Sequence, residues 1–167
     1  MNASDHQHAE PGFVGNVPRF VSDAEFDAAF TGAPVDVQAA VFATLATSLV
    51  DQFALREFPI VAELMNDLAR EVRAPSRREV DIREGLIQPL AERFYAGGQD
   101  DPFEADPAWR RMQGGVALSV LFGAAQGPGG WRDRRDALHH AQLAFGDDWP
   151  VIRTQLADQI HSGQPPE

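Results

Sequence analysis

Apolar residues recur three and four positions apart along most of the chain, which is the spacing of one face of an α-helix. The strongest example is the segment 35–57, whose apolar stripe is wider than that of an ordinary surface helix. The stripe consists of Val41, Phe42, Leu45, Ala46, Leu49, Val50 and Phe53. We therefore predict that this segment is the central and most buried helix.

The same spacing predicts further helices on both sides of this segment. A short helix with Phe26 and Phe30 on one face precedes it, and residues 32–34 end that helix. Later helices are predicted over 60–73, 76–97, 108–125 and 131–145 and from 149 onward. Residues able to cap a helix stand before several of them: Ser22 with Glu25, Ser76 with Glu79, Asp106 with Pro107, and Asp148.

No segment alternates between apolar and polar residues over a length that would build a sheet. The segment 13–21 contains β-branched and aromatic residues, but Gly15 and Pro18 interrupt it, so we expect an extended arm rather than a paired strand. The predicted fold is all-α, an irregular single-domain helical bundle of about six or seven helices with an extended N-terminal arm. Residues 13–162 form the predicted domain, between flexible tails at 1–12 and 163–167.

Composition narrows the possible functions. The chain has 167 residues, of which 44% are hydrophobic, so one domain can bury a substantial core. The absence of cysteine excludes thiol catalysis and thiolate metal ligands. The polar N-terminus lacks the pattern of a secretory signal, and the longest uncharged apolar run, near 114–123, is short for a membrane span. We expect a soluble, cytoplasmic protein.

The net charge is −11, and all fourteen basic residues are arginine. A GC-rich genome explains a lysine-free chain more simply than selection against lysine modification does. Residues 1–69 hold two arginines against ten acidic residues. This charge repels nucleic acid and anionic membranes, and neither is a predicted partner.

Small residues recur every four positions in the helix predicted over 108–125, at Gly115, Ser119 and Gly123. Such a face permits close approach by a neighbouring helix or by a flat ligand. Tight packing inside the bundle is the favoured interpretation. The alternative is a ligand pocket with this face as its floor and with Asp136 and His139 among its polar groups.

The adjacent His139 and His140 diverge by about 100° on a helix, so they cannot both bind one metal ion from a regular helix. His140 is expected to face solvent beside Asp136, and His139 to lie on the flank of the apolar face near Leu143. No zinc, di-iron or serine-nucleophile motif is present. We therefore predict no metal, no cofactor and no catalytic residue.

These exclusions favour a non-catalytic protein that binds another protein, or itself, as an accessory subunit or regulator. Aromatic and arginine residues of the kind enriched at interfaces are available for this: Trp109, Arg110, Arg111, Trp131, Arg132 and Trp149. Burial in the core is the competing explanation for each tryptophan. Two alternatives remain open, the small-molecule or catalytic pocket and an acidic immunity or antitoxin-like protein that neutralises a basic partner.

Overall fold

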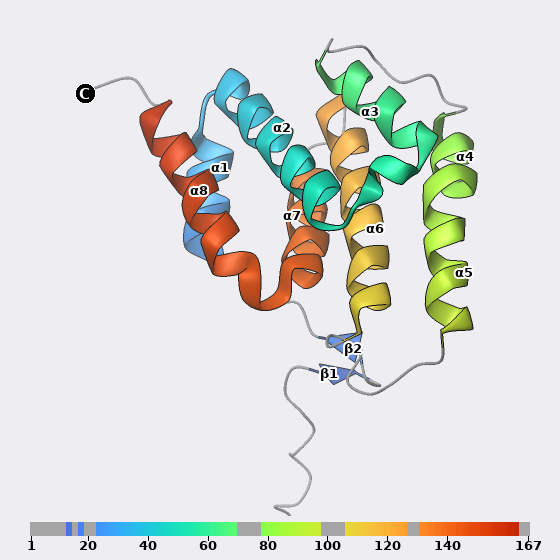
Figure 1. Ribbon diagram of the computed structural model, residues 1–167. Helices are drawn as coiled ribbons and strands as arrows, with labels where there is room; N and C mark the ends of the chain where they lie inside the picture. Colours follow the sequence, from blue (N-terminus) through green and yellow to red (C-terminus); the bar gives the residue numbers. More distant parts are fainter. Residues whose placement is uncertain are drawn as a thin grey trace, which may run out of the picture.

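The computed structural model describes residues 13–14, 17–18, 23–69, 78–97, 106–126 and 131–163 (Figure 1). The fold is all-α, as predicted, and its helices pack around one apolar core. Helices α6 and α7 lie side by side, α5 flanks α6, and α1 packs against α8. Within the described residues, no helix is both long enough and apolar enough to cross a membrane.

Helix α1 spans Ala24–Gly32 and buries Phe26 and Phe30, as their spacing predicts. Its N-cap is Asp23, whose Oδ1 accepts a hydrogen bond from the Phe26 amide at 3.1 Å. The predicted cap at Ser22 is therefore wrong by one residue. Aspartate is itself a favoured N-cap residue, and Arg153 of helix α8 also pairs with the Asp23 carboxylate.

Helix α2 spans Val35–Gln52, and every member of the predicted apolar stripe is buried. The helix was expected to continue to residue 57, but it ends at Gln52. Ala54 adopts a left-handed conformation with φ of 51°, and a 3₁₀ turn, η2, follows at Leu55–Glu57. Helix α3 then spans Pro59–Ala69, with proline at its first position. The rest of the helix predicted to residue 73 and the cap at Ser76 lie outside the described residues.

One helical rod contains α4 at Arg78–Ile82, a π-helical turn, η3, at Arg83–Ile87, and α5 at Gln88–Ala96. The sequence predicted interruptions at Gly85 and Pro89. The chain accommodates both by widening one turn, in which the Gln88 amide bonds to the Arg83 carbonyl. Pro89 has no amide proton to donate, which explains why a wider turn precedes it. The rod ends before Gly97, as predicted.

Helix α6 spans Pro107–Gln126 and starts at the predicted cap, where Asp106 Oδ1 accepts a hydrogen bond from the Ala108 amide at 2.8 Å. Helix α7 spans Trp131–Phe145 and ends at Gly146, whose φ of 56° suits glycine. A 3₁₀ turn, η5, at Gly146–Asp148 leads into helix α8 at Trp149–Ser162. Asp148 occupies the N-cap position of α8, but its side chain makes no capping hydrogen bond.

The segment expected to run as an unpaired arm contains two short strands instead. Strands β1, Phe13–Val14, and β2, Val17–Pro18, pair antiparallel, with Val14 opposite Val17. The prediction of no paired strand here is therefore wrong.

Candidate functional site

The structure places two of the tryptophans predicted at an interface in the core. Trp109 is 4% exposed and Trp149 is 7% exposed. The Trp149 ring meets Phe26 edge-on at 6.2 Å and stacks near Phe145 at 6.4 Å. In this structure both indoles contribute to packing, which is the competing explanation for their presence. The side chains of Trp131 and Arg132 lie outside the described part.

Arg110 closes the C-terminal end of α7. Its guanidinium donates to the carbonyl of Ala144 at 3.0 Å and to that of Phe145, and it lies 3.6 Å from the Asp148 carboxylate. The last carbonyls of a helix have no partner within the helix and carry partial negative charge. The arginine supplies both the donors and the compensating charge.

Arg111 has the same role at the end of α2. It donates to the carbonyls of Phe53 at 2.8 Å and Ala54 at 2.9 Å, and it lies 3.3 Å from the Glu57 carboxylate. Arg110 and Arg111 both lie near the N-terminal end of α6, where a positive charge opposes the dipole of its own helix. The contacts show what offsets that cost, because Arg110 and Arg111 cap the ends of two other helices.

Glu57 joins Arg111 to a second arginine. Its other carboxylate oxygen accepts a hydrogen bond from Arg93 of α5, and both guanidinium groups lie beside the Phe58 ring, at 5.1 and 5.4 Å. The hydrogen bond from Arg93 is the main cause that lowers the pKa of Glu57 below its ordinary value. The local sequence pattern did not reveal this cluster, since its members come from three separate segments.

The small-residue face of α6 is filled where the structure describes it. A Cβ atom on Gly115 would lie 2.4 Å from Leu90 Cδ1, and one on Gly114 would lie 2.6 Å from the Phe53 ring. Ser119 is half-buried, and its hydroxyl donates to the Val116 carbonyl at 2.8 Å. At these positions the face packs against α5 and the end of α2. The surroundings of Gly123 lie outside the described part.

The polar residues assigned to the possible pocket belong to a different helix. Gly115 meets α5, whereas Asp136 and His139 are on α7, where Asp136 is exposed and His139 is half-buried. The described part places Leu90, Leu86 and Ile87 around Gly115, so this end of the small-residue face is filled by α5 and η3. It also contains no group of three or more histidine and acidic side chains that could hold a metal ion.

His140 is half-buried, which corrects the expectation that it faces solvent. Its Nδ1 lies 3.4 Å from Gln113 Oε1, because α6 runs alongside α7 and covers this flank. Burial lowers the pKa of His140, and the nearby Asp136 carboxylate partly opposes that effect.

The outer side of α2 is a second surface of small residues, and sequence analysis did not single it out. We call it the α2 face, and its members are exposed or half-exposed: Ala39, Ala40, Ala43, Thr44, Thr47 and Ser48. The chain has no charged residue between Asp36 and Asp51, so the whole face is uncharged. The sequence could have revealed this face, because its residues are the positions of α2 that lie outside the predicted apolar stripe.

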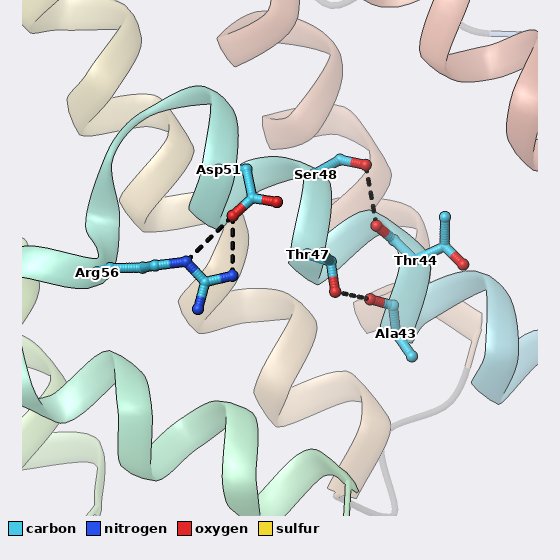
Figure 2. A network of polar contacts seen from close by, with 6 residues as sticks. All are labelled: Ala43, Thr44, Thr47, Ser48, Asp51 and Arg56. Carbon is cyan, nitrogen blue, oxygen red and sulfur yellow. Dashed lines mark hydrogen bonds and ion pairs between the residues drawn. The ribbon is translucent and has the colours of Figure 1, made fainter.

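The polar groups of the α2 face are satisfied within the helix. The hydroxyls of Thr44, Thr47 and Ser48 donate to the carbonyls of the residues four positions earlier, at 3.0 to 3.1 Å. Figure 2 shows two of these bonds, together with the Asp51–Arg56 ion pair of 2.9 Å where the face ends. The hydroxyls need no water or external partner to complete a hydrogen bond as donors.

These features make the α2 face a candidate contact surface. Small side chains let another backbone come close, and they lose little conformational freedom when they are covered.

In comparisons with known proteins, the chain matches no protein-family model, no curated protein and no solved structure.

Proposed function

We propose that the protein acts by binding another protein through the α2 face, as an accessory subunit or a regulator. The observation that carries this proposal is an uncharged, exposed surface of small residues on a chain of which 23% is charged. The low free-energy cost of burying the α2 face supports this assignment of the contact surface, because burying a polar group is expensive only when its hydrogen bond is lost. The three hydroxyls of this face keep their bonds within α2.

The role of the predicted interface arginines supports placing the contact on α2 rather than at the start of α6. Arg110 and Arg111 donate to carbonyls inside the fold. A partner that used them would compete with the caps of α7 and α2. The α2 face offers a surface that requires no such rearrangement.

The test is an arginine substitution at the middle of the face. Ala43→Arg places a long charged side chain on the surface that a partner would cover. Ala62→Arg, at an exposed position of α3, is the matched control because it makes the same chemical change elsewhere. A protein that co-purifies with the wild-type chain and with Ala62→Arg should be absent with Ala43→Arg.

The identified partner is then purified and titrated against all three chains. We expect Ala43→Arg to weaken binding at least tenfold, which corresponds to about 1.4 kcal/mol, while Ala62→Arg binds as the wild type does. Equal affinity of Ala43→Arg and wild type would refute the assignment to α2. If the partner is a second copy of this chain, the wild type sediments as an oligomer and Ala43→Arg as a monomer.

The charge distribution supports a narrower form of the proposal, in which the partner is basic. Among the described arginine side chains, five pair with carboxylates of the fold: Arg56, Arg93, Arg110, Arg111 and Arg153. Exposed carboxylates such as Asp36, Asp81 and Glu84 have no ion pair within the described part. The outward charge is therefore mainly negative, as an immunity or antitoxin-like protein would require.

The salt dependence of association distinguishes a basic partner from a partner that is bound through the uncharged α2 face alone. Raising the ionic strength from about 0.1 M to about 1 M shortens the Debye length from about 10 Å to about 3 Å. A complex steered by charge should then associate much more slowly, whereas a contact made only by the uncharged α2 face should change little. An association rate that is independent of salt would exclude the basic partner and leave the α2 assignment intact.

A further inference from the structure

We draw no further inference here: the strongest candidate, the side-chain cluster between η2, α5 and α6 in which Arg93 and Arg111 share the Glu57 carboxylate beside Phe58, has donors already taken by Glu57 and by the carbonyls at the end of α2, and nothing in the described part of the structure points to a ligand there.

Discussion

Helices α2 and α6 each present a face of small residues, and the two faces have opposite surroundings. On α6, Gly115 lies so close to Leu90 that even a methyl group would overlap it. On α2, Ala40, Ala43 and Thr47 are exposed. Small residues four positions apart determine how closely a neighbour can approach. They do not determine whether that neighbour belongs to the same chain.

The largest expected difference between the two faces comes from adding a leucine to each. Gly115→Leu should lower the free energy of unfolding by about 3 kcal/mol, because a branched side chain must displace Leu90 in a packed core. Ala43→Leu should change it by less than about 0.5 kcal/mol, because the position is open. Urea denaturation measures both. Similar losses for the two variants would mean that the α2 face is packed in solution.

The next largest difference is expected between the two arginines near the end of α2, in the stability that each contributes. Arg111→Ala should cost about 2 kcal/mol, because it leaves the carbonyls of Phe53 and Ala54 without a donor and removes a partner of Glu57. Arg56→Ala should cost less than about 1 kcal/mol, because Arg56 is exposed and its ion-pair partner among the described residues is the exposed Asp51.

Thermal unfolding of the two arginine variants provides the measurement. A larger loss of thermal stability for Arg56→Ala than for Arg111→Ala would contradict this prediction. That outcome would mean that the ion pair at the end of the α2 face supports the fold more than the cap of α2 does.

A smaller effect concerns pH at the contact between α6 and α7. The pKa of His140 is lower in the folded chain than its ordinary value of about 6.5, so the unfolded chain binds the proton more readily. Stability should therefore fall as the pH drops through about 6.5 and toward the lower pKa of the folded state. His140→Gln should reduce this dependence, measured as the urea midpoint between about pH 5 and pH 8. An unchanged slope would place His140 in solvent, as the sequence pattern predicted.

The smallest effect is expected on the α2 face itself. Thr47→Val removes a hydroxyl that, among the described residues, donates to the Ala43 carbonyl, and it nearly preserves the side-chain shape. The free energy of unfolding should change by less than about 0.5 kcal/mol, as for most surface substitutions. Binding to a partner should be retained or strengthened, since the face becomes more apolar. Loss of binding would show that the partner uses the hydroxyl directly.

Part of the candidate site could have been read from the sequence. The α2 face is the complement of a buried stripe that the apolar spacing predicts correctly, so its residues follow from helix geometry. Its exposure does not follow, because α6 also has a small-residue face and that one is covered. Likewise, Trp109 and Trp149 suit an interface by residue type, but packing places them in the core.

Local sequence patterns predict the all-α class and many helix boundaries correctly, because periodicity and capping depend on neighbouring residues. Asp106 with Pro107 starts α6, and Gly146 ends α7, where the pattern predicts. The structure adds that α1 starts after Asp23, that α2 ends at Gln52 and that the face of α6 is filled at Gly114 and Gly115. Distant side chains contact each of these places: Arg153 at Asp23, Arg111 at the carbonyls of Phe53 and Ala54, and Leu90 at Gly115. A local pattern contains no information about which distant side chain will supply the missing contact.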